Sequence, residues 1–350
     1  MAKTSHTAGR PPRIDVHTHV AFPEILAMAR SIKVHGSGPG KRDWVPAESR
    51  QEHARQTSAI DDKLTDPRAR LADMKAMGVD MQVVSMNLPT PCYWANGRQG
   101  AEIARACNRL MAEFVNAMPE RYVGIGVVAL QDMGTTLKEL DYLVHEFGLR
   151  GVQIPSSVRN HDLGEAHFRP FWARLEALGI PAIVHPRGFT HDDRLHKFFL
   201  WNSIGQPLEE ALAMASLIHE GILDAYPKVK IVISHGGGYL PFYPGRSDKA
   251  FESRPEVHSR IGKKPSAYMR SFFYDSVIFD RDMLPALVKR VGAGRIMMGS
   301  DYPRGEIETD PVGFVSKAGL PAADRDKILS GNAQALFGIK MPAAPARGTR

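Results

Sequence analysis

Short apolar runs recur along the chain, and most are separated from the next by enough residues for a helix. Eight of them have the length of a strand and lie at residues 13–17, 81–86, 122–128, 151–154, 181–185, 230–235, 272–277 and 295–300. Their apolar positions are nearly continuous rather than alternating. This pattern predicts strands that are covered on both faces, as in a parallel sheet.

The stretches between these runs have the apolar spacing of helices. The spacing predicts seven helices, at residues 67–77, 102–117, 135–147, 166–178, 208–225, 282–291 and 324–337. Several of them run into a glycine, as at Gly78, Gly148 and Gly179, the residue that most readily takes the left-handed conformation of a helix end. Alternating strands and helices indicate an α/β fold. Both an open doubly wound sheet and a closed (β/α)8 TIM barrel share this local pattern, and eight repeats favour the barrel.

The domain organisation follows from the barrel. We expect residues 13–339 to form one domain, because barrels of this class commonly reach about 250 residues or more. Residues 20–62 form a long insertion after the first strand, with a Gly/Pro/Lys-rich centre, and are predicted to be a lid or added subdomain above the barrel mouth. Residues 1–12 and 340–350 are rich in small, basic and proline residues and are predicted to be flexible tails.

Composition narrows the class of protein further. The 350 residues carry a formal charge of +7, but the basic residues are scattered, so we expect an acidic small-molecule substrate and no nucleic acid. Neither a secretory signal nor an apolar run of about 18 residues occurs, so no membrane association is expected. Two cysteines, Cys92 and Cys107, cannot form a disulfide framework and fit a cytoplasmic protein.

The most informative motif is His17-Thr18-His19 in the first strand. Side chains two apart on a strand point to the same face, so the two imidazoles project together. On its own the motif could also decorate a turn after a buried strand. Other predicted strands, however, also end in chemically capable residues: His185, His235 and Asp301. Because the carboxyl ends of barrel strands meet at one face, these residues are expected to converge.

His17, His19, His185 and Asp301 supply three imidazoles and a carboxylate, a set that suits a divalent transition metal. Zinc is the first expectation and manganese the alternative. His235 is followed by three glycines, whose backbone a substrate could approach closely. This glycine run lacks the spacing of a nucleotide-binding loop, so no organic cofactor is expected.

These motifs resemble the amidohydrolase superfamily, in particular the branch that contains aminocarboxymuconate semialdehyde decarboxylase and the resorcylate and carboxyvanillate decarboxylases. The matching stretches are IDVHTHV at 14–20, IVHP at 183–186, SHGGGYLPFYPGR at 234–246 and MGSDYP at 298–303. The resemblance implies that His17, His19, His185 and Asp301 hold the metal. It also implies that His235 is an acid/base or polarising group.

The resemblance makes two further statements about the site. Arg246 matches a residue that contacts the substrate carboxylate across a dimer interface, although an arginine here could also form a surface salt bridge. We therefore expect a homodimer or a higher homo-oligomer. Binuclear members of the superfamily carry a modified lysine at the end of the fourth strand, whereas residues 151–155 read GVQIP. One metal ion is therefore expected rather than two.

The sequence also departs from the semialdehyde decarboxylases. Arg187 and Arg304 stand where those enzymes carry aromatic residues. Guanidinium groups at the barrel mouth would bind carboxylates, although either could instead belong to a structural ion pair. Tyr93 and Trp94 follow the second strand and could line a pocket for a flat ring. The substrate is therefore expected to differ from the semialdehyde.

The resulting prediction is a metal-dependent, non-oxidative decarboxylase of an aromatic or muconate-type carboxylic acid. A proton from Asp301 or His235 would reach the carbon that bears the carboxylate, and CO2 would leave. The alternatives are a metal-dependent hydrolase of an amide, ester or lactone, and a hydratase of an unsaturated acid. The remaining histidines, His161 and His167 among them, lack a strand-end position and are expected to have surface or capping roles.

Overall fold

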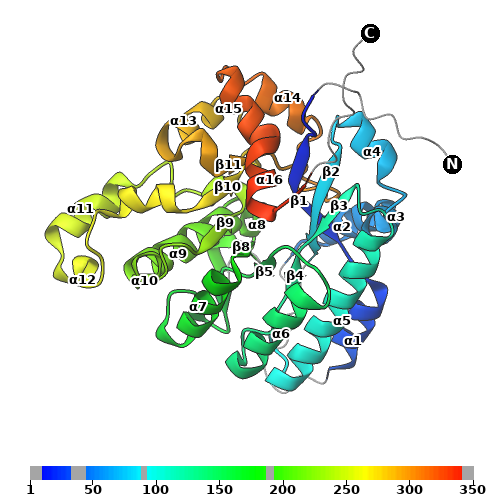
Figure 1. The fold of residues 1–350 in the computed structure, drawn as a ribbon, viewed down its shortest axis with the longest axis horizontal. Helices are drawn as coiled ribbons and strands as arrows, with labels where there is room; N and C mark the ends of the chain where they lie inside the picture. Colours follow the sequence, from blue (N-terminus) through cyan, green and yellow to red (C-terminus); the bar gives the residue numbers. More distant parts are fainter. Residues whose placement is uncertain (1–9, 33–44, 88–92, 187–192, 341–350) are drawn as a thin grey trace, which may run out of the picture.

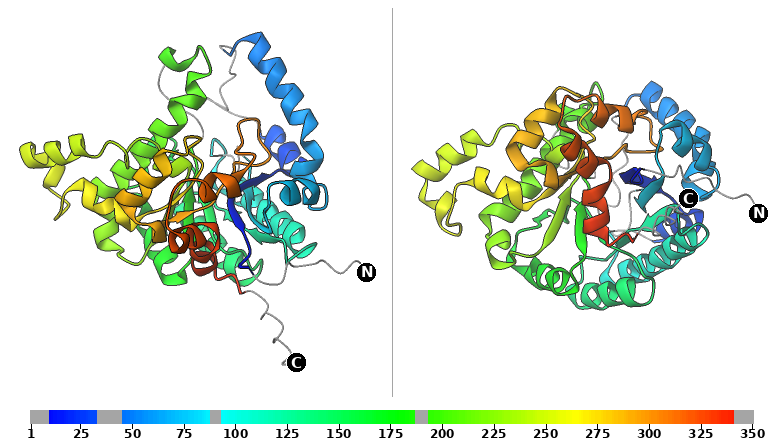
Figure 2. Two further views of the ribbon diagram at one scale, coloured as in Figure 1. Left: turned by 90° about the horizontal axis from the view of Figure 1, so that it is seen from above. Right: turned by 45° about the horizontal axis from the view of Figure 1, so that its top comes forward.

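A ring of short parallel strands with helices around its outside makes up the protein (Figure 1; Figure 2). The computed structural model describes residues 10–32, 45–87, 93–186 and 193–340. The strands of the ring, in chain order, are β1 (Ile14–Val20), β2 (Met81–Met86), β3 (Tyr122–Gly124) with β4 (Gly126–Val127), β5 (Val152–Ile154), β8 (Pro181–Val184), β9 (Lys230–Ile233), β10 (Phe273–Asp275) and β11 (Ile296–Met297).

The strands of the ring pair in parallel in chain order, as β1-β2-β3 and as β4-β5-β8-β9-β10-β11. β3 and β4 are separated only by Ile125, whose N–H donates to Val84 of β2, so the two segments together form the third strand. The last strand returns to the first: the N–H of Val16 donates to the carbonyl of Met298 at 2.8 Å, and the N–H of Asp301 donates to that of His17 at 2.9 Å. These bonds close the ring, as predicted for a (β/α)8 barrel.

Successive side chains of a strand point to opposite faces, and they form two separate apolar clusters. The smaller fills the interior of the ring with side chains such as Val16, Ile183, Val232 and Met297. The larger lies between the strands and the helices, and it includes Val184, Ile233 and Met298 from the opposite strand faces. Strands buried on both faces explain the continuous apolar runs in the sequence.

The helices that cover the ring connect successive strands. The α-helices are α1 (Pro23–Ser31), α2 (Ala47–Ala59), α3 (Asp61–Thr65), α4 (Leu71–Ala76), α5 (Gly97–Asn116), α6 (Met133–His145), α7 (Arg169–Leu178), α8 (Leu200–Ser203), α9 (Gly205–His219), α10 (Ile222–Ala225), α11 (Gly245–Ser253), α12 (Pro255–His258), α13 (Met283–Val291), α14 (Pro311–Ser316), α15 (Ala322–Asp326) and α16 (Asn332–Phe337). Short 3-10 turns and one π-helical segment, Lys327–Gly331, complete the connections.

Several elements were not predicted. A small antiparallel hairpin, β6 (Ser157–Val158) with β7 (His161–Asp162), follows the fourth strand of the ring. Helices α11 and α12 form an arm that projects away from the barrel (Figure 1; Figure 2). The predicted helix at 324–337 consists of two short α-helices with the π segment between them.

The insertion after β1 is helical where it is described. It contains α1, α2 and α3, and residues 33–44 lie outside the described residues. The fully buried Arg70 anchors it: its guanidinium donates to the carbonyl of His19 at 2.7 Å and to that of Lys63 at 3.1 Å. The insertion is thus tied to the strand that carries the histidine pair. Its action as a lid stays a prediction, and most of both predicted tails, residues 1–9 and 341–350, lies outside the described residues.

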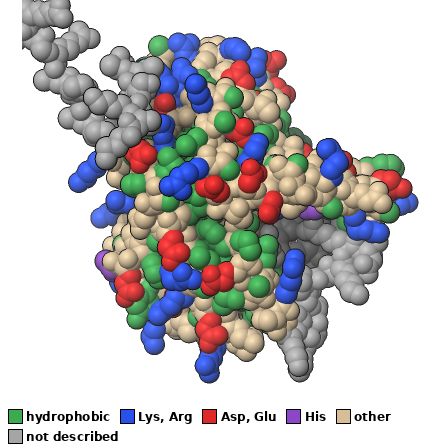
Figure 3. Space-filling view, turned by 90° about the vertical axis from the view of Figure 1, so that its right-hand side faces the viewer, with side chains coloured by type: hydrophobic (Ala, Val, Ile, Leu, Met, Phe, Trp, Pro, Cys, Tyr) green, Lys and Arg blue, Asp and Glu red, His purple; other side chains and the backbone are tan. Residues whose placement is uncertain are grey.

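Side chains of both charges are interspersed over the face that Figure 3 shows. No helix in the described part of the chain is long and apolar enough to cross a membrane.

Candidate metal centre

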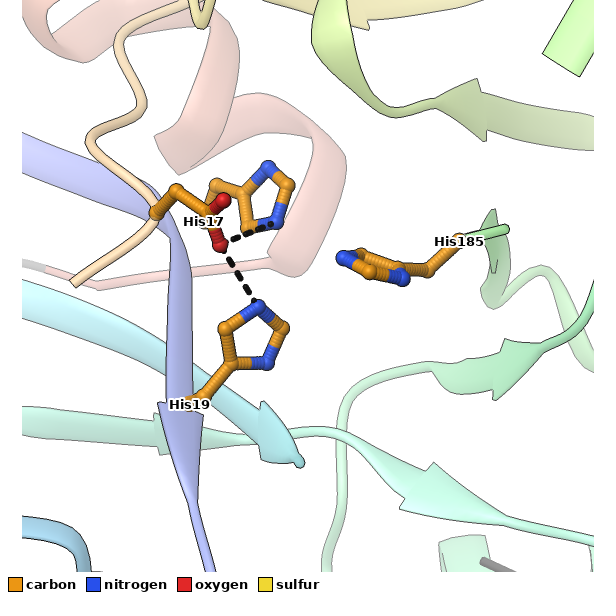
Figure 4. Close-up of side chains that lie close together, drawn as sticks. His17, His19 and His185 are labelled. Carbon is orange, nitrogen blue, oxygen red and sulfur yellow. Dashed lines mark hydrogen bonds and ion pairs between the residues drawn. The ribbon is translucent and has the colours of Figure 1, made fainter. Parts of the chain in front are cut away.

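Four predicted ligands come together at the carboxyl ends of the strands. His17 and His19 lie in β1, His185 directly follows β8, and Asp301 follows β11. One ligand atom of each lies within 4.8 Å of the others. Figure 4 shows the imidazoles of His17 and His19 projecting from one strand, with His185 facing them from across the ring. The structure therefore builds the three-histidine and one-aspartate set from three strands.

An irregularity in β1 turns its histidines inward. Asp15 pairs with Gln82 of β2, but Thr18 pairs with Val84, so β1 has one residue more than its partner over this interval. An extra residue reverses the alternation of side chains along a strand. Val16 faces the interior cluster before the irregularity, and His17 reaches the interior after it. This bulge was not predicted from the sequence.

Hydrogen bonds fix which nitrogen two of the imidazoles present. Nδ1 of His17 lies 2.7 Å from Oδ2 of Asp275, at the end of β10, and Nδ1 of His185 lies 2.9 Å from the carbonyl oxygen of Pro186. Both acceptors require a proton on Nδ1. In each ring Nε2 is then left as the ligand atom, the arrangement that usually supports a metal-bound imidazole.

The buried nitrogen atoms are suited to a metal ion. Nε2 of His17 and Nε2 of His185 have no hydrogen-bond partner among the described residues, although Nε2 of His17 lies 3.3 Å from Oδ1 of Asp301. Ligands about 2.1 Å from a tetrahedral zinc ion are separated by about 3.4 Å, so this spacing is close to that of two ligands of one ion. A metal would therefore satisfy both orphaned atoms.

Charges in the centre favour the forms that bind metal. Burial alone would raise the pKa of Asp301, but the neighbouring His17 and the hydrogen bonds of the imidazoles hold it well below its usual value. Burial lowers the pKa of His19 and lowers that of His185 still further. An ionised carboxylate and neutral imidazoles are the states that coordinate metals. His17 is the exception, because burial is outweighed by Asp301 and Asp275, which raise its pKa to about 9.

His235 lies beside the four ligands but is held by a different carboxylate. Its Nδ1 is 2.5 Å from Oε1 of Glu210, a fully buried residue of α9, and its Nε2 is 3.7 Å from Oδ2 of Asp301. Burial would lower the pKa of His235, but the charges of Glu210 and Asp301 raise it well above its usual value. His235 is thus fixed at one nitrogen and directed towards the centre at the other.

The glycines after His235 make this contact possible. At Gly238, which has a φ of 59°, an added Cβ would lie 2.0 Å from the carbonyl oxygen of Pro207 in α9. Only a residue without a side chain lets the turn lie this close to the helix. His235 and Asp301 themselves have φ values of 48° and 66°. Left-handed backbone at non-glycine residues is uncommon and tends to occur at functional sites.

Gln153 in β5 is a further polar group within the ring. It pairs in register with Ile183 of β8, two residues before His185, and its side chain is 4% exposed. Neither the oxygen nor the nitrogen of its amide has a hydrogen-bond partner among the described residues. Buried amides are normally hydrogen-bonded, so the group is available to a ligand.

The two barrel-mouth arginines can be described only in part. Arg304 follows Asp301 closely, its side chain is partly buried, and its charge contributes to the lowered pKa of His19 after the larger effects of burial. Its backbone N–H donates to the carbonyl of Asp301 at 3.2 Å, so it lies at the edge of the metal centre. Arg187 lies outside the described residues.

Tyr93 and Trp94 follow β2 and are the first residues described after position 92. The phenol of Tyr93 donates to the carbonyl of Val128 at 3.1 Å, and only 8% of the residue is exposed. Trp94 is partly buried against the larger core cluster. Both residues pack as part of the core, and their contact with a substrate ring stays a prediction.

Arg246 does not lie within the metal centre of its own chain. It is an exposed residue at the start of α11 and lines a shallow surface pocket with Tyr239 and Tyr243. It forms no ion pair with any described residue, so nothing described supports the salt-bridge alternative. Its predicted contact with substrate would require a second subunit.

Comparison with known proteins identifies the family. Residues 14–339 match the family described as Amidohydrolase. The chain belongs to this amidohydrolase family. The match includes all four residues of the metal centre as well as His235 and Arg246.

Relatives of this amidohydrolase include decarboxylases. It is 30% identical to a 2-amino-3-carboxymuconate-6-semialdehyde decarboxylase of Dictyostelium discoideum, over 80% of this chain and 79% of that protein. The structure of 5-carboxyvanillate decarboxylase from Sphingomonas paucimobilis is 26% identical, with a TM-score of 0.81 over 94% of this chain and 99% of the other. A dihydroxybenzoic acid decarboxylase from Polaromonas with bound manganese is also 26% identical, with a TM-score of 0.76 over 94% and 97%.

Sequence reasoning missed three residues of this amidohydrolase that the structure places around the centre: Glu210, Asp275 and Gln153. Asp275 ends the observed strand β10, two residues before the end of the predicted strand at 277, so the rule that selects His185 does not reach it. Gln153 lies in the segment 151–155, where the sequence pattern of the family points only to the absence of a lysine. Glu210 lies in an ordinary amphipathic helix and gave no local signal.

Proposed function

We propose that this amidohydrolase is a metal-dependent carboxy-lyase that removes CO2 from an aromatic or muconate-type acid without an oxidant. The observation that carries the proposal is a metal site beside which a separate histidine, His235, is held by its own buried carboxylate. Decarboxylation needs both functions, a cation to bind acidic oxygens and an acid to protonate carbon. The named decarboxylases among the relatives support the same reaction.

His17, His19, His185 and Asp301 would hold the metal. When bound, a divalent ion acts as a Lewis acid that binds the carboxylate and a neighbouring oxygen of the substrate and stabilises negative charge on them. The chain's own residues complete the binding. Arg304, at the edge of the centre, is placed to pair with an anionic group, and the Gln153 amide can donate to or accept from a substrate oxygen.

His235 is the proton donor in this proposal. Its Nδ1 is occupied by Glu210, so its Nε2 carries the proton towards the substrate. The proton bonds to the carbon that bears the carboxylate, and the electrons of the carbon–carboxylate bond return to the ring as CO2 leaves. Solvent then reprotonates His235. Asp301, whose pKa is held low by His17 although burial opposes this, is assigned to metal binding instead of proton donation.

Zinc is the proposed resident metal, because three of the four ligands are imidazoles. Manganese is the alternative, and the manganese-containing relative from Polaromonas supports it. Measuring the metal content of protein purified without added metal, and then activity after reloading with each ion, decides between them.

We propose that the enzyme works as a cytoplasmic homodimer in which Arg246 acts on the neighbouring subunit's substrate. The exposed position of Arg246 and the exposure of Tyr243, at 70%, support an interface on this face. Mixing inactive H185A chains with inactive R246A chains tests it. Recovery of activity in the mixture would support contact across the interface, whereas no recovery with mixed dimers present would show that Arg246 does not act on the neighbouring subunit's site.

The experiment on the reaction itself is a decarboxylation assay in D2O. Metal-loaded enzyme is given hydroxybenzoates and muconate-type acids, CO2 is quantified, and the product is examined by NMR. One deuterium at the carbon that lost CO2 is expected. The H235N variant should lose turnover by about 10²-fold or more while keeping its metal. The surface variant H145A should behave as wild type.

The alternative functions give different outcomes. Water added across a double bond would identify a hydratase, and ring opening of a lactone or cleavage of an amide would identify a hydrolase. Absence of CO2 from the full panel with stoichiometric metal present would overturn the decarboxylase proposal.

A further inference from the structure

The connection between β5 and α7 carries a second group of possible metal ligands. His161 lies in β7, Glu165 follows it, and His167 lies in the turn Ala166–Phe168 that leads into α7. One ligand atom from each of the three lies within 4.8 Å of the others. Their side chains are 56%, 37% and 48% exposed, so the group faces solvent. It shares no residue with the centre formed by His17, His19, His185 and Asp301.

Both imidazoles are directed at the same carboxylate oxygen. Oε2 of Glu165 lies 2.9 Å from Nδ1 of His161 and 3.6 Å from Nδ1 of His167. The two rings are 4.9 Å apart and nearly perpendicular, at 80°. Ligands about 2.1 Å from a tetrahedral zinc ion are about 3.4 Å apart. The two distances bracket this value, so the carboxylate oxygen already lies at about ligand spacing from both imidazoles.

The local backbone holds Glu165 in this position. The N–H of Asp162 donates to Oε1 of Glu165 at 2.8 Å, which leaves Oε2 to face the histidines. Between them Leu163 is fully buried, and its carbonyl accepts from the indole of Trp172 at 2.9 Å. The fold therefore already holds the ligands near one another, so metal binding would lose less conformational entropy.

The donor atoms of the group favour a transition-metal cation. Two imidazoles and one carboxylate suit borderline ions such as Zn²⁺, Ni²⁺ and Cu²⁺ better than Ca²⁺ or Mg²⁺, which prefer oxygen ligands.

We propose that His161, Glu165 and His167 form an accessory binding site for a divalent transition metal of the zinc class, separate from the catalytic centre. Water would fill the remaining coordination positions, because the group is open to solvent. Three exposed ligands bind more weakly than the four buried ones, so the accessory site fills at higher metal concentration. A bound ion would link the β6–β7 hairpin to the start of α7.

Equilibrium dialysis against zinc chloride, followed by metal analysis, tests the proposal on the full-length protein. Wild type is compared with H161A, H167A and the matched surface variant H145A over about 1 to 100 µM zinc, the range expected for an exposed three-ligand site. Wild type and H145A should bind one zinc more per chain than H161A or H167A. The variant H167C, which supplies a thiolate ligand, should restore binding.

The H185A variant separates this proposal from the proposed function. It should lose the tighter zinc and retain the weaker one, whereas H167A should do the reverse. Zinc should also raise the melting temperature of H185A, and this rise should vanish in H185A combined with H161A. Equal zinc stoichiometry in wild type, H161A and H167A would overturn the accessory site, whatever the catalytic centre binds.

Discussion

Asp275 should control how tightly the metal centre holds its ion, although it is not a ligand. Its Oδ2 lies 2.7 Å from Nδ1 of His17, and its Oδ1 accepts the N–H groups of Gly236 at 3.1 Å and Val277 at 3.0 Å. Burial would raise the pKa of Asp275, but the charge of His17 keeps it below its usual value, so the group is an anion. Every oxygen of this carboxylate therefore accepts a hydrogen bond.

The substitution Asp275→Asn preserves the shape and reverses one of these bonds. The amide oxygen must stay with the two backbone N–H groups, because the amide nitrogen cannot accept from them. The amide nitrogen then faces Nδ1 of His17 and donates to it. His17 must move its own proton to Nε2, the atom directed at the metal. The substitution thus places a proton on the His17 nitrogen that would bind the metal, although residue 275 is not itself a ligand.

Loss of such a supporting group typically lowers metal affinity by about 10- to 100-fold, or about 1.4 to 2.8 kcal/mol. We expect the upper end, because the variant disfavours the required tautomer as well as removing a charge. Zinc affinity is measured by competition with a chromophoric chelator. Asp132→Asn is the matched control, because Asp132 caps α6 and asparagine caps helices equally well. Wild-type zinc affinity in D275N would refute the reasoning.

Three further predictions concern buried charges. Glu210→Gln should lower kcat by about 10-fold or more with metal content unchanged, since it disturbs the hold on His235; an unchanged kcat across the pH range would contradict this role. Burial raises the folded-state pKa of Asp15 from 3.8 to about 7, so its ionisation destabilises the folded state as pH rises through that interval. The stability of Asp15→Asn relative to wild type should therefore increase by about 3 kcal/mol between pH 5 and pH 8 in urea unfolding, and a constant difference would argue against the raised pKa. Arg70→Met leaves the carbonyl of His19 without its hydrogen-bond donor and should lower the free energy of unfolding by about 3 kcal/mol or more in the same assay. A nearly unchanged free energy of unfolding would show that water or repacking replaces the guanidinium.

The parts of the site that could be predicted are those that lie at strand ends. His185 and Asp301 were found because a parallel barrel brings all its strand termini to one face, so a local pattern implied a long-range meeting. Asp275 obeys the same rule. The sequence pattern hides it, because the apolar run continues to residue 277, beyond the observed end of β10.

Other features had no local signal. Glu210 belongs to a helix whose sequence reads as an ordinary amphipathic segment, and only the turn after β9 shows which of its residues meets His235. Helix α2 has no buried residue, so it lacks the apolar stripe by which helices are recognised. The early start of α5 did have a signal, since Asn96 caps the helix by accepting from the N–H of Gln99 at 2.9 Å.

Two buried carboxylates, Asp275 and Glu210, support different residues of the centre but both contact the turn after β9. Asp275 supports a metal ligand and also accepts the N–H of Gly236, while Glu210 supports His235, the residue just before that glycine. A change at Asp275 can therefore reach both the metal and the proton donor through the backbone. A change at Glu210 acts first on the proton donor, because its carboxylate is hydrogen-bonded to His235. The glycines of the turn allow both contacts. The turn lies against α9, which carries Glu210, and against β10, which carries Asp275, and added side chains would clash with both elements.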